Sequence, residues 1–307
     1  MNLLVNTSVG SRLPAFLVQI IVNAGRFPIL DCALFFEEKM MKKALSIAGS
    51  DCSGGAGIQA DIKTFSAHGV FGMTVITSVV AENTFRVTDY QDIRPDIIKK
   101  QIDDVFEDIV PDAVKIGMLS CRETMLAAAD KLKEWKPLNV VIDPVMYAKN
   151  GCALMEMASI DTLISEVLPL ADVLTPNIPE AEKISGMTIK TSDDMKEAAK
   201  KILSMGCRAI VIKGGHKEGD ASDILFDGKD FYEFSAKRVE TKHTHGTGCT
   251  FSSAIAANLS LGFSINESVE RAKKYINTAI ANAPGLGKGN GPVHHFYDMY
   301  ESHSRRN

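Results

Sequence analysis

Residues 43–68, with the sequence KALSIAGSDCSGGAGIQADIKTFSAH, join a buried strand, a glycine-rich loop and an amphipathic helix. The predicted strand, residues 43–49, is a near-continuous apolar run of the kind that a parallel sheet buries on both faces. The predicted helix, residues 59–68, repeats its apolar side chains at helical spacing. This stretch therefore predicts the first half of a βαβ unit and, with it, an α/β fold.

The same alternation of strand and helix continues along the chain. Further strands are predicted at residues 73–81, 112–118, 139–145, 171–177 and 209–215. Helices are predicted between them at residues 95–109, 122–134, 159–168, 178–185 and 193–205. Crossovers of this kind are right-handed, which predicts a doubly wound, mostly parallel central sheet with helices on both faces. An Asp-Gly pair between two short apolar runs indicates a hairpin over residues 223–236, and two more helices are expected near 247–261 and 266–283.

The composition is that of an ordinary globular protein. Hydrophobic residues make up 45% of the 307 residues and charged residues 23%, which is enough for one large α/β core. The net charge of −4 leaves no electrostatic footprint for nucleic acid. The six cysteines include no C-x-x-C pair and fit neither a zinc site nor a disulfide framework, so they predict reduced thiols in a cytoplasmic protein.

Residues 1–40 differ from the rest of the chain. They are apolar but interrupted by residues such as Pro14, Pro28 and Asp31, which makes them too broken to span a bilayer. They also lack the basic start of a secretory signal. We therefore expect a single domain over residues 41–307. The poorly specified extension before it is expected to be either an upstream translation artefact or a loosely packed appendage.

A second glycine-rich stretch, HTHGTGCTFSSAIAA at residues 243–257, leads into a helix of small residues. Gly246 and Gly248 allow a tight turn in which successive N–H groups converge near the positive end of that helix, an arrangement suited to phosphate. Cys249 falls in the first helical turn, where the helix dipole is expected to lower the pKa of its thiol. The alternatives are a plain loop-to-helix turn and a buried cysteine that packs as a small hydrophobe.

The glycine loop after the first strand raises a dinucleotide alternative. Residues 55–60, GAGIQA, match the G-x-G-x-x-A pattern, and Glu82 is suitably placed for the ribose acid. In that fingerprint, however, the first glycine follows the strand closely, whereas the five residues 50–54 intervene here. The chain also has no G-K-[ST] in this loop, so dinucleotide and P-loop binding are both disfavoured.

Polar side chains follow several of the predicted strands, at the edge where open α/β sheets bind their ligands. Asp143 is suited to Mg²⁺ or to capping a helix, and Lys213 is suited to neutralising a phosphate. Asn177 and Glu180 fit the start of a helix, either as a capping box or as part of a hydrated magnesium site, and both roles are compatible. The H-x-H pair at residues 243–245 has no evident third ligand and is not expected to hold a metal.

Seven stretches of the chain stand in a characteristic order. They are LSIAGSDCSGGAGIQADIKTFSAHGVFGMTVITSVVAENT, KIGML, VVIDPVM, LTPNIPEAE, VIKGGH, HTHGTGCTFSSAIAANL and GKGNGPVHHF. Together they closely resemble the hydroxymethylpyrimidine/phosphomethylpyrimidine kinases of thiamine biosynthesis, a family of the ribokinase-like superfamily. The resemblance covers residues 42–300 and does not extend to residues 1–40.

The resemblance implies an ATP- and Mg²⁺-dependent kinase that acts twice on a small pyrimidine. It first phosphorylates the hydroxymethyl group of 4-amino-5-hydroxymethyl-2-methylpyrimidine and then converts the monophosphate to the diphosphate. The implied substrate pocket comprises Glu82 at the pyrimidine edge, with Gly49, Asp61, Val80, Met118 and Val145. The implied nucleotide region comprises Asp143, Asn177, Glu180, Lys213 and Thr247, with Asp143 and Glu180 nearest the metal. The implied catalytic anion hole comprises Gly246, Thr247, Gly248 and Cys249, assisted by Lys213, and Lys288 matches a phosphate contact.

The chain departs from the wider superfamily at Cys249. Sugar kinases usually carry an aspartate there as the base, in a G-A-G-D pattern, which speaks against ribose or fructose as the substrate. Pyridoxal kinases similar to this family keep the cysteine, so they are the alternative, and dual activity stays open. The resemblance also implies a homodimer, and it leaves the need for a monovalent cation open.

These assignments lead to a mechanistic hypothesis. The N–H groups of residues 246–249 hold the transferring phosphoryl group, while Lys213 and Mg²⁺ neutralise the β- and γ-phosphates. Cys249 is expected to accept the hydroxyl proton in the first step only, because the nucleophile of the second step is an already ionised phosphate. The presence of Asp143, Lys213 and the glycine loop speaks against a non-catalytic binding protein. The isolated cysteines speak against a redox thiol protein.

Overall fold

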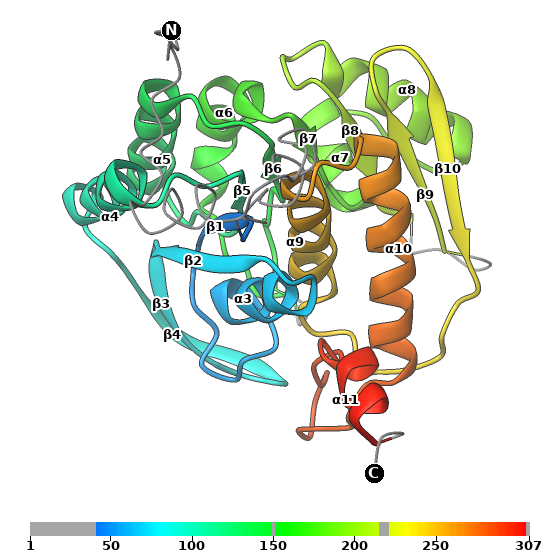
Figure 1. The fold of residues 1–307 in the computed structure, drawn as a ribbon. Helices are drawn as coiled ribbons and strands as arrows, with labels where there is room; N and C mark the ends of the chain where they lie inside the picture. The colour runs from blue at the N-terminus through cyan, green and yellow to red at the C-terminus, as the bar shows by residue number, and fades with distance from the viewer. Residues whose placement is uncertain (1–40, 149–150, 215–220, 305–307) are drawn as a thin grey trace, which may run out of the picture. The chain divides into compact units, whose positions relative to one another are not determined.

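The central sheet has eight strands in the order β10-β9-β8-β7-β6-β5-β1-β2 (Figure 1). The computed structural model describes residues 41–148, 151–214 and 221–304, and residues 41–307 form one compact unit. The strands are β1 Lys43–Ala48, β2 Phe71–Ile76, β5 Ala113–Ile116, β6 Val140–Ile142, β7 Val173–Leu174, β8 Ile210–Ile212, β9 Ala221–Phe226 and β10 Phe231–Ala236. Neighbouring strands pair in parallel from β8 through β7, β6, β5 and β1 to β2. At the other edge, β9 runs antiparallel to β8 and forms the predicted hairpin with β10. The predicted mostly parallel α/β sheet is confirmed.

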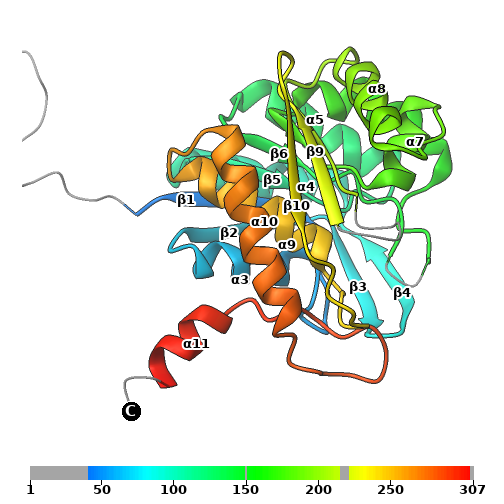
Figure 2. The same cartoon turned by 90° about the vertical axis from the view of Figure 1, so that its right-hand side faces the viewer.

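Helices cover both faces of the sheet, as predicted. They are α3 Gly57–Ala67, α4 Pro95–Asp108, α5 Arg122–Trp135, α6 Ile160–Thr162, α7 Ile178–Ser185, α8 Ser192–Leu203, α9 Thr247–Ser260, α10 Ile265–Ala281 and α11 Tyr297–Ser304. Side chains alternate between faces along each strand, so Val140 and Ile142 pack with α4, α5, α7 and α8, whereas Val141 packs with α3, α9 and α10. Figure 2 shows α9 and α10 on the opposite side of the sheet from α7 and α8.

The predicted single strand over residues 73–81 is wrong. Strand β2 ends at Ile76, and the chain leaves the sheet at Thr77. The N–H of Thr77 donates a hydrogen bond to the carbonyl of Ala48, and its hydroxyl donates to the carbonyl of Met118. The chain then forms a separate antiparallel pair from β3, Ser78–Asn83, and β4, Arg86–Asp92 (Figure 1). Only Thr77 and Ser78 separate the two apolar runs, and neither glycine nor proline marks the break in the sequence. Glu82 therefore belongs to this small sheet and not to a strand of the central one.

The predicted helix over residues 159–168 is also irregular. It consists of the single α turn α6, a π turn over Leu163–Val167 and a 3₁₀ turn over Leu168–Leu170. Pro169 lies in the last turn, where its missing N–H and its ring prevent a regular helix from continuing. Strand β4 and helix α11 were not predicted, because most side chains of β4 are exposed and polar and α11 carries no marked apolar face.

Helix α9 is the element that positions the glycine loop of residues 246–248. All of its residues from Thr250 to Ser260 are buried, and most are small, so the helix packs closely between the sheet, α3 and α10. Its N-terminus consequently points to the edge where β5 and β6 end, both of which it contacts. Among the described residues, no helix combines the length and the apolar character that crossing a membrane would require.

Candidate active site

The predicted site residues gather where the parallel strands end. Gly49 directly follows β1 and Met118 follows β5, and a Cβ placed on Gly49 would lie 3.1 Å from the Met118 sulfur. Asp143 follows β6, and Lys213 follows β8. Four separate stretches of the sequence therefore meet at one edge of the sheet, as the carboxyl-end rule predicts.

The two glycine-rich loops touch each other through their backbones. Gly246 has a φ of +74°, a conformation that residues with a Cβ rarely adopt. A Cβ on Gly246 would also overlap the carbonyl oxygen of Gly55. This close approach places the start of α9 against the loop that follows β1.

The first turn of α9 faces an ion pair. The first helical hydrogen bond runs from the N–H of Thr250 to the carbonyl of Gly246, at 2.9 Å, so the N–H groups of Gly248 and Cys249 have no intrahelical acceptor. The N–H of Thr247, a predicted donor of the anion hole, instead donates to the carbonyl of Thr244 at 3.3 Å. A Cβ on Gly248 would lie 3.3 Å from an Asp143 carboxylate oxygen and 3.4 Å from the Lys213 nitrogen. Main-chain donors, a lysine and a carboxylate thus border the same small space.

Lys213 and Asp143 form this ion pair, with 2.7 Å between Nζ and Oδ1. Burial opposes the charge on Lys213, but the negative charges of Asp143 and Glu180 outweigh it and raise the pKa of the lysine. Burial raises the pKa of Glu180 to about 7, with Lys213 opposing the shift and Asp143 adding to it. The Lys213 ammonium group therefore forms an ion pair with Asp143 and also interacts electrostatically with the buried carboxyl group of Glu180.

Asn177 and Glu180 form the capping box at the start of α7. The Asn177 side chain accepts from the Glu180 N–H at 2.9 Å, and the Glu180 carboxylate accepts from the Asn177 N–H at 2.8 Å. The capping interpretation is confirmed. Glu180 is also buried beside Lys213, so the cap holds its carboxylate next to the ion pair.

The expected thiolate at Cys249 is contradicted. Burial raises the pKa of the Cys249 thiol to about 11, with Lys115 opposing the shift and the carboxylates of Asp61 and Asp143 adding to it. The helix dipole and an N–H from Gly57 favour the thiolate, but they are too weak to overcome burial between two carboxylates. The protein alone therefore holds Cys249 as a neutral thiol at neutral pH.

Asp61 lies below the site in a fully buried ion pair. Both of its oxygens lie within hydrogen-bond distance of the Lys115 nitrogen, at 2.8 and 2.9 Å, and the hydroxyls of Ser46 and Ser253 also donate to it. Neither side chain of the pair has exposed surface. This arrangement does not fit the predicted contact between Asp61 and a substrate. Lys115 was not predicted as part of the site, although a lysine inside the apolar run AVKIGM indicates a buried partner.

Asp51, His245 and Glu82 form a second cluster of ionisable groups. The His245 Nε2 and an Asp51 oxygen are 2.8 Å apart, and one oxygen or nitrogen atom from each of the three side chains lies within 4.8 Å of the others. Burial opposes both charges of the pair. The mutual hydrogen bond nevertheless holds the pKa of Asp51 well below its usual range and raises that of His245. Sequence distance hid this cluster, because 194 residues separate Asp51 from His245.

The structure places the remaining predicted residues as follows. Val80 is buried in β3, with its N–H 3.3 Å from the Ser50 hydroxyl. Val145 is half-buried two residues after Asp143. The Thr247 hydroxyl donates to the carbonyl of Thr244 at 2.8 Å, so it is engaged within its own loop.

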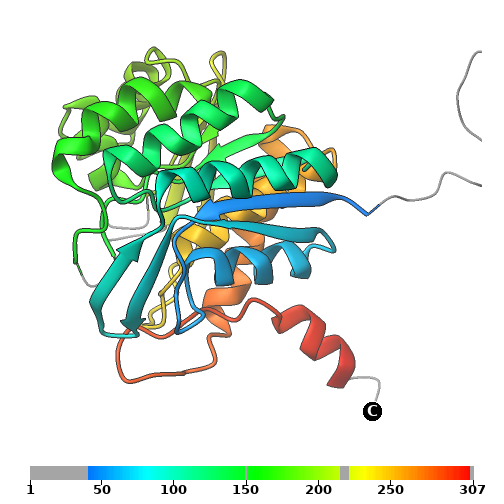
Figure 3. The ribbon, with the colours of Figure 1, turned by 90° about the vertical axis from the view of Figure 1, so that its left-hand side faces the viewer.

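Lys288 is exposed in the glycine-rich loop that follows α10. That loop packs on the tip of the β3–β4 pair, where the N–H of Asn290 donates to the carbonyl of Thr84 at 2.7 Å (Figure 3). A Cβ on Gly287 or Gly289 would overlap atoms of Thr84, so the glycines permit this close contact. Lys288 thus lies on the loop that covers the turn after Glu82.

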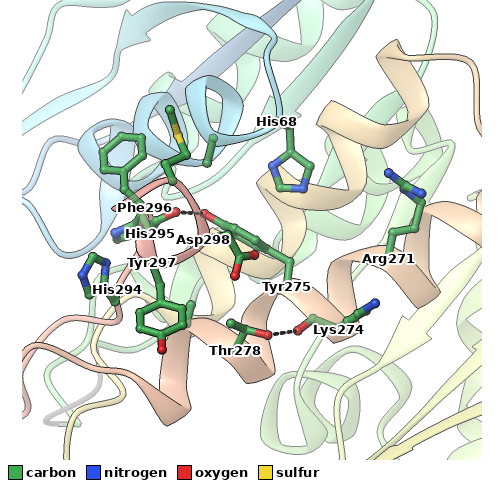
Figure 4. Close-up of a pocket in the computed structure, with 13 residues that line it drawn as sticks. His68, Arg271, Lys274, Tyr275, Thr278, His294, His295, Phe296, Tyr297 and Asp298 are labelled. Carbon is green, nitrogen blue, oxygen red and sulfur yellow. Dashed lines mark hydrogen bonds between the residues drawn. The ribbon is translucent and has the colours of Figure 1, made fainter. Parts of the chain in front are cut away.

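A cavity of about 280 Å³ lies elsewhere, between α3, α10 and the segment leading into α11 (Figure 4). Arg271, Lys274 and Tyr275 of α10 line it together with His68, which follows α3. None of the predicted site residues is among the residues that line it. The candidate site is therefore the sheet edge at the N-terminus of α9, and this cavity is a separate feature.

The fold and this edge define the class of protein. A mostly parallel sheet whose carboxyl edge brings together a helix N-terminus, a lysine and two carboxylates is the arrangement of a phosphotransferase with a ribokinase-like fold. The profile of the phosphomethylpyrimidine kinase family matches residues 51–294. The chain belongs to this family.

Curated relatives carry the corresponding names. The hydroxymethylpyrimidine/phosphomethylpyrimidine kinase of Bacillus subtilis is 46% identical over 256 residues, which cover 83% of this chain and 94% of the relative. The same enzyme of Rhizobium meliloti is 49% identical over 262 residues, 84% of this chain and 98% of the relative. A thiamine biosynthesis bifunctional protein of Geobacter sulfurreducens is 47% identical, and the match spans only 51% of that longer protein.

Solved structures with the same fold include two kinds of vitamin kinase. The ADP complex of Bacillus subtilis pyridoxal kinase superposes with a TM-score of 0.78 at 42% identity, covering 85% of this chain and 99% of that one. Phosphomethylpyrimidine kinase of Clostridium difficile gives 0.72 at 48% identity, covering 78% and 99%. Pyridoxal kinase of Staphylococcus aureus with AMP-PCP and pyridoxal gives 0.77 at 34% identity, covering 84% and 96%.

Proposed function

We propose that this chain transfers phosphate from ATP first to 4-amino-5-hydroxymethyl-2-methylpyrimidine and then to the resulting monophosphate. One observation carries the proposal: the first turn of α9 borders the Asp143–Lys213 ion pair at the edge where the parallel strands end. Free N–H groups and an ammonium group beside one space suit a phosphoryl group in transit. The family and the names of the relatives support the same activity.

In this mechanism, positioning and neutralisation of charge do most of the catalysis. The N–H groups of Gly248 and Cys249 hold the equatorial oxygens of the phosphoryl group, over which its negative charge is spread while the electron pair of the breaking bond moves to ADP. Lys213 neutralises the adjacent phosphate oxygens, and Asp143 keeps the lysine charged and oriented through the 2.7 Å contact. A loose transition state needs no strong base, because the hydroxyl proton can leave after the new bond has begun to form.

The donor set at this edge fits a magnesium ion. Asp143 and Glu180 would supply carboxylate oxygens, and the single positive charge of Lys213 does not balance both carboxylates, which favours a further cation there. Mg²⁺ favours few carboxylates and keeps several waters, so Glu180 is able to serve while its second oxygen caps α7. When bound with ATP, the ion would offset phosphate charge. Asp143 and Glu180 are the residues that would hold it.

Replacing Cys249 with serine tests the corrected role of the thiol. A neutral thiol positions the hydroxymethyl group without removing its proton, so Cys249→Ser should slow the first phosphorylation by only about tenfold, below the factors typical of a lost base. The wild-type to variant ratio of single-turnover rates should also stay constant between about pH 6.5 and 9. A ratio that grows tenfold for each pH unit would show that the thiolate is the active form and restore its role as base.

Replacing Glu82 with leucine tests the assignment of the substrate pocket. Glu82→Leu removes a half-buried hydrogen-bonding group of matching size, so the KM for the pyrimidine should rise about 30-fold, equivalent to roughly 2 kcal/mol. The KM for ATP should stay within about twofold. Steady-state kinetics with each substrate varied in turn measures both values. Weaker ATP binding would place Glu82 in the nucleotide subsite instead.

Pyridoxal phosphorylation is the second candidate activity, favoured by the likeness to two pyridoxal kinase structures at 34–42% identity. One ATP-consumption assay with the hydroxymethylpyrimidine, its monophosphate, pyridoxal and ribose distinguishes the candidates. The proposal expects turnover of both pyrimidines and none of ribose. Turnover of pyridoxal alone would contradict it, and turnover of all three aromatic substrates would establish dual activity.

A homodimer and a cytoplasmic location remain predictions. The need for a monovalent cation remains an open question. None of the described cysteines forms a disulfide, which is compatible with a reducing compartment. The expectations for residues 1–40 lie outside the described residues.

A further inference from the structure

Glu82 directly follows an irregularity in the β3–β4 pair, which changes the direction of its side chain. The β3–β4 ladder shifts register between Ala81 and Glu82, and the Thr88 hydroxyl fills the irregularity by donating to the carbonyl of Ala81 at 2.8 Å. Such bulges change the direction in which the next side chain points. On the other side, the thiol of Cys52 lies 3.0 Å from the Glu82 carbonyl and 3.4 Å from its N–H. The backbone of Glu82 is therefore fixed from both sides.

The carboxyl group of Glu82 lies near an aspartate and a histidine that come from two other loops. The loop after β1 contributes Asp51 and the neighbouring Cys52, and the loop before α9 contributes His245. Asp51 accepts from the N–H groups of Gly55 and Ala56, at 2.9 and 2.7 Å, as well as from His245, so it is a fixed negative charge.

The charged residues near Glu82 on its own sheet and on the covering loop are exposed. They are Arg86 and Asp89 of β4 and Lys288 of the loop after α10. Solvent screens exposed charges strongly. The ionisation of Glu82 is consequently governed by burial and by the Asp51–His245 pair.

The number of hydrogen bonds between Glu82 and the pyrimidine edge depends on whether a proton lies between them. A 4-aminopyrimidine presents an amino group that donates and, next to it, a ring nitrogen that accepts. An ionised carboxylate only accepts, so it satisfies the amino group but turns a lone pair toward the ring nitrogen. One proton between the carboxyl oxygen and the ring nitrogen converts this repulsion into a second hydrogen bond. The match is the same whether the proton resides on the acid or on the ring.

We propose that Glu82 binds the aminopyrimidine together with one proton, shared between its carboxyl group and the ring nitrogen, and that the Asp51–His245 pair sets the pH range in which that proton is available. This inference rests on the proposed pyrimidine kinase function. It makes Glu82 a specificity-determining group that depends on pH, with Asp51 and His245 as positioning residues.

The direction of the pH effect follows from the free protein. Burial raises the pKa of Glu82 to about 7, Asp51 adds to the shift and His245 opposes it. Below that pH the acid already carries the proton, so the KM for the pyrimidine is constant. Above it, binding must take up a proton, and the KM rises by up to about tenfold for each pH unit.

The test compares Glu82→Gln with the wild-type protein from about pH 6 to 9. An amide supplies one donor and one acceptor without any proton, so the variant should keep a KM that is independent of pH. The ratio of wild-type to variant KM should rise about 50-fold between pH 7 and 9, and taking the ratio cancels ionisations that both proteins share. Asp89→Asn is the matched control, because it removes one charge from an exposed position of the same small sheet. Its KM should follow the wild-type profile.

Two outcomes separate the inference from the function on which it rests. If wild-type protein at pH 6.5 does not phosphorylate the hydroxymethylpyrimidine, the proposed function fails. If it does, and the KM ratio stays flat across the pH range, the shared proton is wrong. If Glu82→Gln fails to fold, calorimetry of the wild-type protein measures the proton uptake directly. The pyrimidine is titrated at pH 8 in two buffers of different ionisation enthalpy. Uptake of about one proton per pyrimidine is expected, and no uptake overturns the inference.

Discussion

Replacing Asp61 with alanine is expected to lower the free energy of unfolding by about 3–5 kcal/mol, because the variant leaves the Lys115 ammonium group buried without its counter-charge. Both side chains are fully buried, and two serine hydroxyls also lose their acceptor. A loss of this size is a large share of the roughly 5–15 kcal/mol that stabilises a typical domain. Urea unfolding followed by circular dichroism measures it.

Two further variants define the origin of the loss. Asp61→Leu combined with Lys115→Met removes both charges and should recover much of the stability, because apolar replacements of a buried ion pair are often tolerated. Asp96→Ala breaks an exposed pair with Arg94 and should leave the unfolding midpoint unchanged. If Asp61→Ala unfolds like the wild-type protein while its KM for the pyrimidine rises, Asp61 contacts the substrate after all.

Most strands of the central sheet and most helices that cover it were predictable along the chain, because their cause is local. Buried parallel strands appear as apolar runs and the covering helices as amphipathic segments, and both patterns are strong from Lys43 to Ala281. The capping box of Asn177 and Glu180 is equally local, since it depends on residues three apart. The glycine loop and Cys249 were placed correctly at the start of α9 for the same reason.

The break after β2 and the two buried ion pairs were not predicted because they depend on contacts between distant segments. The break at Thr77 follows from hydrogen bonds to Ala48 and Met118, and neither is visible in the apolar run itself. The Asp51–His245 pair and the Asp61–Lys115 pair join residues that are 194 and 54 positions apart. Position along a chain does not reveal which loops will meet at one edge of a sheet.

The pKa of Cys249 shows how a correct local rule is overruled by tertiary structure. A helix N-terminus stabilises a thiolate by an interaction equivalent to about half a unit charge. In the folded protein Cys249 is half-buried near Asp61 and Asp143, and the partial loss of water and these full negative charges raise the pKa of its thiol. Only the folded arrangement shows which effect is larger.

We expect the first turn of α9 to hold the transferring phosphoryl group beside Asp143 and Lys213. Gly248→Ala tests it directly, since the new methyl group would lie 3.3–3.4 Å from those two side chains, in the space that the phosphoryl group needs. Gly248 lies within α9 and has no left-handed φ, so alanine, a better helix former, does not weaken the fold. Displacing the reacting group by about 1 Å costs on the order of 100-fold in rate.

Gly262 supplies the matched control just beyond the other end of α9. It has a φ of +92°, and a Cβ there meets nothing within 4 Å, so Gly262→Ala should lose about 1–2 kcal/mol of stability and keep its activity. The decisive measurement is kcat for both phosphorylations in Gly248→Ala, with unfolding curves for both variants. We predict that Gly248→Ala keeps wild-type stability while both rates fall about 100-fold. A stable Gly248→Ala variant with wild-type kcat for both steps would contradict the claim.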